Sequence, residues 1–435
     1  MKKTINISLI LCFLLITVYS FSQNTEELFL LKKLKSISKD NIIALEHTSV
    51  CKEKYQIKIT QSLDHNNPDA GNFTQRVFLS FNDLSKPVVF ITEGYSASYA
   101  KNPAYQNELT NIIDANEICV EHRFFGESVP DSLDWQYLTV EQAANDHHNV
   151  IELLKKIYKG KWVSTGISKG GQTCMYHRYF FPDDVDASVP YVAPLNFASE
   201  DPRAYTFLEN VGDSTCRAKI YNYQKTMLEG KKKYLPKFKK LAHKKNLHYS
   251  MGLEAAFELT VLEYPFAFWQ WGTFNCNSIP TDLSAKKMIN HLDKVAGIDW
   301  VSEEGVSKLL PFFYQAMTEI GFYGYDTTNF PGLITALKKP DFYFTCPENT
   351  TCAFNPDLMK KVDAFIRHEA QNMIFIYGEA DPWSSTSVDL TGRKNMIKMV
   401  KKGGSHRTRI RSFYGEEKEK IYKSLEKWLN LKIIR

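Results

Sequence analysis

The segment from Lys161 to Phe181 constrains the fold more than any other part of the sequence. It reads KWVSTGISKGGQTCMYHRYFF, which is an apolar run, a serine between glycines and a stretch compatible with a helix. Gly166 and Gly170 fit the pattern Gly-x-Ser-x-Gly, in which a serine occupies a strained turn between a strand and a helix. The pattern alone is weak, but both neighbours that the turn requires are present. Ser168 is therefore a candidate nucleophile, and the alternative is an ordinary glycine turn.

Apolar runs before and after this turn predict an α/β sheet. The helical spacing of residues 139–158 predicts a helix, and Thr139 with Gln142 predicts a capping box at its start. Because strands and helices alternate, we expect a largely parallel sheet with right-handed crossovers. Five runs in the first half of the chain are predicted as strands: residues 56–63, 73–81, 87–94, 117–123 and 161–166.

The alternation stops between about residues 196 and 361, where aromatic residues and helix-like segments such as 252–272 and 308–326 dominate. Strand signals then return, and a final helix is predicted from about 416 to 431. The simplest interpretation is a helical cap inserted between late strands of one sheet. The predicted organisation has four parts: a signal peptide at 1–22, the first part of the α/β domain at 23–195, a helical cap at 196–361 and the second part of the α/β domain at 362–435.

Two late strand signals end in residues that are able to activate Ser168. Asp381 lies near the end of IFIYGEADPW at 374–383, and His406 is the last residue of IKMVKKGGSH at 397–406. A serine hydroxyl needs an adjacent base that a third group orients, and the order serine, acid, histidine accompanies this type of turn. We therefore predict a catalytic triad of these three residues. Glu379 is the alternative acid, while a turn at Asp381-Pro382 and a solvated loop at His406 are the non-catalytic interpretations.

Backbone N–H groups near Ser168 are candidates for an oxyanion hole. The N–H of Lys169 directly follows the nucleophile, and a second donor is expected from Gly94 or Tyr95, after the strand at 87–94. The side chain of Lys169 is not expected to be the base, because adjacent helical residues point in different directions.

Two other pairs of polar residues receive structural interpretations. His147 and His148 are consecutive in a predicted helix, so they lie on different faces and cannot chelate one metal ion together. We predict both as surface residues and expect no metal site. Glu127 and Ser128, in HRFFGES, are predicted to brace a loop rather than to catalyse.

The amino-terminal segment predicts export. An apolar run from Ile5 to Val18 follows two lysines and precedes the small residues Ser20 and Ser22, which is typical of a secretory signal peptide. Cys12 raises the alternative of a lipoprotein, but the apolar run continues beyond it. No later segment is long and apolar enough to span a membrane. The net charge of +5 is small for 435 residues, so nucleic acid is not the expected partner.

Seven cysteines follow Cys12, and an oxidising compartment would allow them to form disulfides. Cys346 and Cys352 flank a short loop and are the favoured pair, and Cys216 with Cys276 is the second choice. The odd count leaves at least one thiol unpaired. The spacings do not resemble a zinc site.

Taken together, these motifs resemble the secreted prolyl tri- and tetrapeptidyl aminopeptidases and, more distantly, lysosomal Pro-X carboxypeptidase and dipeptidyl peptidase II. The SKGG sequence is more similar to the aminopeptidase branch. The resemblance implies an α/β-hydrolase sheet with an inserted helical cap over a Ser168, His406 and Asp381 triad. The matching segments span most of the chain: QSLDH at 61–65, TEGY at 92–95, EHRFFGES at 121–128, GISKGG at 166–171, FYQAMTEIGFYGYD at 313–326, DPWSSTSV at 381–388 and GGSH at 403–406.

The implied activity is that of a serine exopeptidase that releases short N-terminal peptides, cleaves after proline through an acyl-enzyme and needs no cofactor. Its partners would be peptide substrates with a free N-terminus. An esterase or lipase on the same fold and a catalytically inactive surface-binding homologue are the alternatives.

Such an exopeptidase needs an apolar slot for proline and a carboxylate for the terminal ammonium. Phe322, Tyr323 and Trp383 are candidate walls of the slot, with ordinary core packing as the alternative. Glu93 and Glu319 are candidate partners of the ammonium, with a loop brace and a helix-surface charge as the respective alternatives. A Pro-X carboxypeptidase would need a cation in that place.

Overall fold

The fold was analysed in a computed structural model that describes residues 30–36, 41–433 and 435. The predicted signal peptide, including Cys12, lies outside the described residues. The described strands are β1 (Ile42–Ala44), β2 (Glu53–Ser62), β3 (Asn72–Phe81), β4 (Val88–Thr92), β5 (Asn116–Val120), β6 (Trp162–Ile167), β7 (Ala187–Tyr191), β8 (Met373–Gly378) and β9 (Met396–Lys401).

The α-helices divide into those that pack on the sheet and a group of six between residues 203 and 315. The sheet helices are α2 (Glu108–Ile112), α3 (Val140–Leu154), α4 (Lys169–Phe180), α11 (Asp357–His368) and α12 (Gly415–Leu429). The others are α5 (Arg203–Asn210), α6 (Ser214–Glu229), α7 (Lys231–Lys244), α8 (Leu253–Trp271), α9 (Ala285–Val295) and α10 (Glu303–Gln315).

The described strands form one nine-stranded sheet in the order β1-β2-β3-β5-β4-β6-β7-β8-β9. β3 is antiparallel to both of its neighbours, whereas all strands from β5 to β9 run parallel. This order, with its exchange of β4 and β5, is that of the α/β-hydrolase fold, which confirms the predicted fold class. β1 and β7 are the strands that the sequence patterns did not predict.

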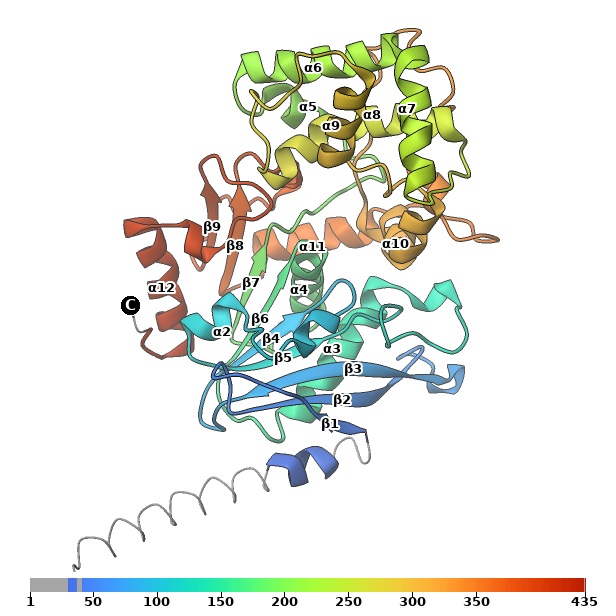
Figure 1. The fold of residues 1–435 in the computed structure, drawn as a ribbon. Coiled ribbons are helices and arrows are strands. Elements are labelled where there is room, and N and C mark those ends of the chain that lie inside the picture. The colour runs from blue at the N-terminus through green and yellow to red at the C-terminus, as the bar shows by residue number, and fades with distance from the viewer. Residues whose placement is uncertain (1–29, 37–40, 434) are drawn as a thin grey trace, which may run out of the picture.

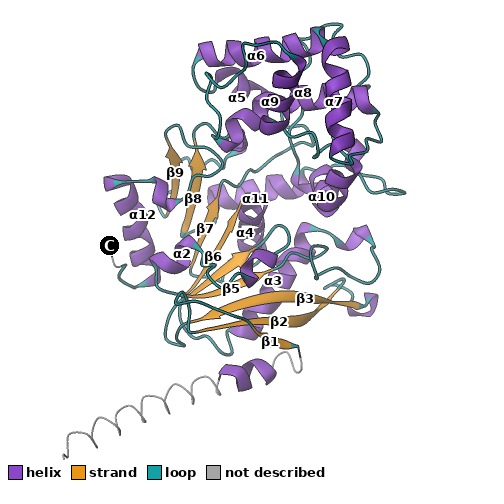
Figure 2. Cartoon of the chain, in the orientation of Figure 1, coloured by secondary structure: helices purple, strands orange, loops and turns teal. Residues whose placement is uncertain are grey.

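Helices cover both faces of the sheet, which explains why the central strands are buried on both sides. Apolar side chains of α2 and α12 pack with one face, and those of α3 pack with the other. β4, β5, β7 and β8 consist of buried residues only. Figure 2 shows this layered arrangement of helices around the strands.

The start of α3 shows half of the predicted capping box. The Thr139 side chain accepts a hydrogen bond from the N–H of Gln142 at 3.1 Å, as expected. The Gln142 side chain does not return to Thr139. It instead donates to Asp64 at 2.6 Å and accepts from the N–H of His65 at 2.8 Å. The second half of the box is thus replaced by a contact between α3 and the loop that follows β2.

The prediction that His147 lies on the surface is wrong. Its side chain is only 1% exposed and packs edge-on against Phe90 and near His177, because this face of α3 lies on the sheet. Burial lowers the pKa of His147 to about 3, so the ring is neutral. His148 points elsewhere, stacks on Phe181 and hydrogen-bonds Asp184. The two rings therefore have separate environments.

The helices α5 to α10 form a group beyond one end of the sheet (Figure 1). At its centre is α8, which is buried along most of its length. Pro265 lies inside this helix and has no N–H for the carbonyl of Val261. The side chain of Gln224 on α6 donates to that carbonyl at 2.9 Å, so the proline leaves no unsatisfied acceptor. The boundaries predicted for the cap, at 196 and 361, remain predictions.

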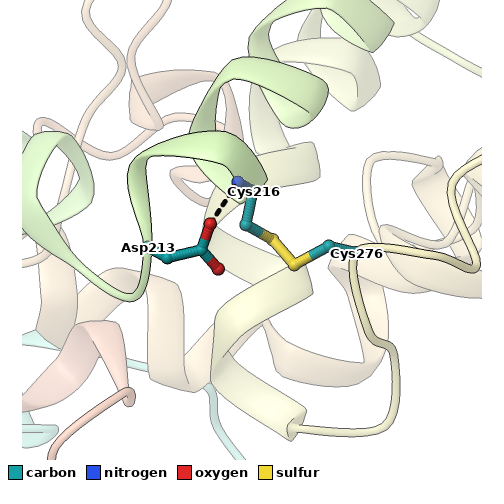
Figure 3. Close-up of side chains that lie close together, drawn as sticks. All are labelled: Asp213, Cys216 and Cys276. Atoms are coloured by element: carbon teal, nitrogen blue, oxygen red, sulfur yellow. Dashed lines mark hydrogen bonds between the residues drawn. A yellow bond between two sulfur atoms is a disulfide. The ribbon is translucent and has the colours of Figure 1, made fainter.

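Both predicted disulfides are present: Cys216–Cys276 and Cys346–Cys352. The first links the start of α6 to the loop after α8, beside Asp213, whose side chain accepts from the N–H of Cys216 at 2.9 Å (Figure 3). These three residues are close enough to resemble a metal site, but the two sulfurs are bonded to each other and offer no thiolates. The described chain contains no helix with the length and apolarity needed to cross a membrane.

Candidate active site

Ser168 lies in a strained turn at the carboxyl end of β6, immediately before α4. Its backbone angles are φ 58° and ψ −121°, a conformation that is costly for a residue with a side chain. The flanking glycines explain how the turn fits: a Cβ on Gly166 would collide with the carbonyl of Gly170, and one on Gly170 would lie 2.8 Å from the carbonyl oxygen of Thr92. The turn is anchored by the N–H of Ser168, which donates to the Tyr191 carbonyl at 2.9 Å.

Asp381 and His406 form a buried pair beyond the ends of β8 and β9. Oδ2 of Asp381 lies 2.7 Å from Nδ1 of His406, and the side chains are 0% and 5% exposed. The other carboxylate oxygen of Asp381 accepts from the N–H of Trp383. This arrangement fixes the imidazole with Nδ1 toward the acid, which leaves Nε2 for a reacting group. Glu379, the alternative acid, instead accepts from the N–H of Gly403 at 2.8 Å.

The three predicted catalytic residues follow strands whose carboxyl ends lie at the same end of the sheet. β6, β8 and β9 run parallel, so the residues that follow them emerge at the same carboxyl end. Only β7 separates β6 from β8, which places the strand ends about 10 Å apart. Among the described residues, no hydrogen bond joins Ser168 Oγ to the imidazole of His406. Ile167, next to the serine, is 38% exposed, so the turn is open to solvent.

His406 also contacts the helical region. Its backbone N–H donates to the carbonyl of Gln270 at 2.8 Å, and the Trp271 ring packs edge-on against its imidazole. Both of these residues belong to the carboxyl-terminal turn of α8. The position of the histidine loop is thus coupled to the helix at the centre of the region between β7 and β8.

The predicted oxyanion residues lie together beside Ser168. Lys169 is the first residue of α4, so its N–H has no acceptor within the helix. Its buried side chain folds back, and Nζ donates to the carbonyl of Gly94 at 2.7 Å above the rings of Tyr95 and Phe125. Burial lowers the pKa of this lysine well below its ordinary value. The lysine side chain is therefore part of the support of the loop at 93–95.

The two carboxylates predicted to bind an ammonium have partners of their own. Glu93 accepts a hydrogen bond from the hydroxyl of Tyr99. Burial raises the pKa of Glu93 to about 7, and hydrogen bonds from Tyr99 and from the Gly94 N–H counteract that rise. Glu319, in the π-helical turn after α10, accepts from the N–H of Val140 at 2.8 Å. Burial likewise raises the pKa of Glu319 to about 7.

The predicted slot residues form one aromatic cluster. The ring of Trp383 lies 5.3 Å from that of Phe322 and 5.2 Å from that of Tyr323. Sequence reasoning missed two further members, Phe266 on α8 and Phe342. Because Trp383 is two residues from Asp381, the cluster borders the acid of the candidate site.

A third carboxylate, Glu263 on α8, was not predicted as a site residue. It is 5% exposed and accepts hydrogen bonds from the hydroxyls of Tyr323 at 3.0 Å and Tyr325 at 2.7 Å. Burial raises the pKa of Glu263 to about 8. The sequence held a signal for it, because Glu263 interrupts a helix that is otherwise apolar around most of its circumference.

Glu127 and Ser128 belong to a network around the buried Arg76–Glu121 ion pair. Ser128 donates to Glu121 and accepts from the N–H of Arg76, each at 2.9 Å. Glu127 pairs with the guanidinium of Arg76. These contacts tie the segment at 121–128 to β3.

A surface cavity of about 870 Å³ lies away from the candidate site. Its lining includes Lys161, Trp162 and Asp186, at the amino ends of β6 and β7. Parallel α/β sheets bind ligands at the carboxyl ends of their strands, so position weighs against this cavity as the reaction site.

Comparison with known proteins identifies relatives along most of the chain. The sequence matches the PS-10 peptidase S37 family over residues 30–431. It is 32% identical over 407 residues to prolyl tri/tetrapeptidyl aminopeptidase from Streptomyces mobaraensis, covering 90% of this chain and 84% of that protein. Lysosomal Pro-X carboxypeptidase from Bos taurus is 28% identical over 160 residues, covering 33% and 32% of the two chains.

Among solved structures, proline iminopeptidase from Mycobacterium smegmatis aligns with a TM-score of 0.38 and 12% identity, over 86% of this chain and 97% of that one. The family match covers most of the chain, and the Streptomyces protein is similar along most of its length. The chain therefore belongs to the PS-10 peptidase S37 family and is a serine peptidase.

Proposed function

We propose that the protein is an exported serine exopeptidase that removes short peptides from free N-termini by cleaving after proline. The observation that carries this proposal is the buried 2.7 Å hydrogen bond between Asp381 and His406, at the sheet edge from which Ser168 also emerges. The similarity to a prolyl tri/tetrapeptidyl aminopeptidase supports the choice of substrate.

In the proposed mechanism, Nε2 of His406 takes the proton of Ser168 as Oγ attacks the carbonyl carbon of the proline residue. Asp381 holds the imidazole by its Nδ1–H and stabilises the cation that forms. The imidazolium then gives the proton to the departing amine, and the C–N bond breaks to leave an acyl-enzyme. Water repeats the sequence and releases the short peptide. Catalytic hydrogen bonds often tighten only with substrate bound, and we expect this for Ser168 and His406.

The oxyanion that forms during attack would accept a hydrogen bond from the Lys169 N–H. Gly94 and Tyr95 are the two candidates for the second donor. The N–H of Gly94 already faces the carboxylate of Glu93, which favours Tyr95. The Lys169 side chain would keep this loop in position through the Gly94 carbonyl.

The aromatic cluster beside Asp381 would supply the slot for the proline ring. A pyrrolidine has no N–H to satisfy and packs well on flat aromatic faces. Trp383 is the proposed floor of this slot, since it is closest in sequence to the acid and touches Phe322 and Tyr323.

Export is proposed from the signal sequence at 1–22, and the two disulfides support it, because such bonds persist in oxidising compartments. The final location, whether periplasm, cell surface or medium, is left open by the sequence.

A peptide-library digest read by mass spectrometry tests the proposal. We expect cleavage after proline near the free N-terminus of each peptide, and loss of cleavage when the terminus is acetylated. Cleavage that survives acetylation would contradict the exopeptidase proposal. An enzyme that is inert toward Xaa-Xaa-Pro amides but fast on acyl esters would instead be an esterase, and failure on both substrates would indicate an inactive homologue.

A further inference from the structure

Glu263 is buried in the helical region, and no lysine, arginine or histidine among the described residues pairs with it. Its partners are two neutral hydroxyls, those of Tyr323 and Tyr325. Burying a carboxylate is costly unless a cation or several hydrogen bonds compensate for the lost hydration. The site thus holds a strong acceptor that has oriented donors but no counter-charge.

Most of the other carboxylates that are more than nine-tenths buried in the described part of the chain contact a lysine, an arginine or a histidine; the exception is Glu117, which accepts from the Asn107 N–H and the Thr110 hydroxyl. Glu258, one and a half turns earlier on the same helix, illustrates the contrast. It pairs with Lys231 and accepts N–H bonds from Ala336 at 3.0 Å and Leu337 at 2.7 Å. The pairs are Glu121 with Arg76, Asp146 with Arg123, Asp184 with His177, Asp201 with Arg203, Glu258 with Lys231 and Asp381 with His406.

The position of Glu263 relates it to the candidate site by two routes. The Tyr323 ring, whose hydroxyl binds Glu263, contacts the Trp383 ring beside the catalytic acid. Glu263 lies seven residues before Gln270 on α8, and the carbonyl of Gln270 accepts a hydrogen bond from the N–H of His406. At 1.5 Å per residue, this separation is about 10 Å along the helix axis.

A cavity of about 240 Å³ is lined by Leu262 and Pro265 of α8 and by Tyr325. Tyr325, which donates to Glu263, therefore also borders open space. The cavity lining carries a negative balance. Glu209 and Asp326 contribute carboxylates, whereas its one cation among the described residues, Arg217, is engaged with backbone carbonyls of residues 210–212.

We propose that Glu263 is the subsite residue that receives the terminal ammonium of the peptide substrate, with Tyr323 and Tyr325 holding its carboxylate in place. The proposal rests on the exopeptidase function proposed above, and it assigns to Glu263 the role that the sequence suggested for Glu93 or Glu319. An ammonium would supply the missing counter-charge. It would replace one of the two tyrosine hydroxyls as a hydrogen-bond donor to the carboxylate. Each of the two sequence candidates is already engaged elsewhere: Glu319 holds the start of α3, and Glu93 braces the oxyanion loop.

The test compares free and N-acetylated Ala-Ala-Pro p-nitroanilide with the wild type, E263Q and E263D. In the wild type we expect kcat/KM to be at least about 100-fold higher for the free peptide, the effect of losing one partner of a buried charge pair. E263Q should reduce that ratio to near one, and E263D, which keeps the charge, should restore part of it. E258Q is the matched control, because Glu258 is a buried carboxylate of the same helix with a structural partner, and it should keep the wild-type ratio.

The outcomes separate the two proposals. A wild type that discriminates between the peptides, together with an E263Q variant that still does so, would overturn the role of Glu263 and leave the exopeptidase intact. A wild type that ignores acetylation would overturn both. The rate of labelling by a fluorophosphonate reports whether the triad of each variant is folded. If E263Q fails to label, E263D decides. Its shorter side chain should give a free-to-acetylated ratio below that of the wild type, and a ratio unchanged from the wild type overturns the assignment.

Discussion

Replacing Glu263 by glutamine is expected to stabilise the protein, and to do so more strongly as the pH rises. Burial raises the pKa of Glu263 from an ordinary 4.5 to about 8. Between pH 4.5 and pH 8, Glu263 is therefore protonated in the folded state and ionised in the unfolded state. The stability of the wild type falls as the pH increases through this window. Glutamine has the same shape and stays neutral, so the variant does not experience this loss.

The magnitude follows from the pKa interval. One pKa unit corresponds to about 1.4 kcal/mol, so the ionised Glu263 costs on the order of 5 kcal/mol as an upper bound. Structural relaxation reduces this value, and we expect E263Q to gain roughly 2–5 kcal/mol on the wild type between pH 5 and pH 9. At about 2 °C per kcal/mol for a large domain, the gain in Tm would be about 4 °C or more at pH 9 and close to zero at pH 5.

Thermal unfolding of both proteins, followed by tryptophan fluorescence at pH 5, 7 and 9, measures this difference. E258Q provides the opposite control. Contacts with Lys231 and three backbone N–H groups lower the pKa of Glu258, so its stabilising effect is present at neutral pH and is lost as the pH falls through and below its ordinary value. E258Q should therefore lower Tm at pH 7. If E263Q lowered Tm by the same amount at pH 5 and pH 9, the argument that Glu263 lacks a counter-charge would be refuted.

Three further substitutions test other parts of the site. D381N should lower kcat by roughly 10³–10⁴-fold, because an amide favours the wrong tautomer of His406. Steady-state assays on a Xaa-Xaa-Pro amide would measure this loss, and a loss below about tenfold would contradict the role of the acid. K169M removes the donor to the Gly94 carbonyl, and we expect kcat to fall about tenfold or more with KM little changed, whereas a change in KM alone would indicate a role in binding. W383A should lower kcat/KM for proline substrates by about 10–100-fold while sparing fluorophosphonate labelling, and equal losses in both assays would point to a general structural role.

The strands that position the site were largely predictable, because buried parallel strands appear as continuous apolar runs. β7 was missed for a physical reason. It contains Pro190, which has no N–H for a ladder hydrogen bond and normally argues against a central strand. The strand nevertheless lies between β6 and β8, and its last residue, Tyr191, accepts the hydrogen bond that anchors the turn at Ser168. A single sequence contains no signal for that pairing.

The groups of the helical region were harder to assign because their roles depend on contacts between distant segments. The sequence left Glu319 open between an ammonium partner and a helix-surface charge, and it held no sign of the π-helical turn that carries Glu319 toward the start of α3. His147 looked like half of a polar pair, but the periodicity of α3 places it against β4. Glu263 stood out only as a charge in an apolar helix, and the tyrosines that bind it lie 60 and 62 residues away in the sequence.

The central claim is that Ser168 is the nucleophile of a hydrolytic triad, and fluorophosphonate labelling tests it most directly. The probe forms a bond to an activated serine oxygen, and peptide mapping by mass spectrometry identifies the modified residue. We predict one modification, on the peptide that contains Ser168, with its rate abolished in S168A and strongly reduced when His406 is replaced by alanine. Absence of labelling in the folded wild type, or labelling that persists in S168A, would contradict the account.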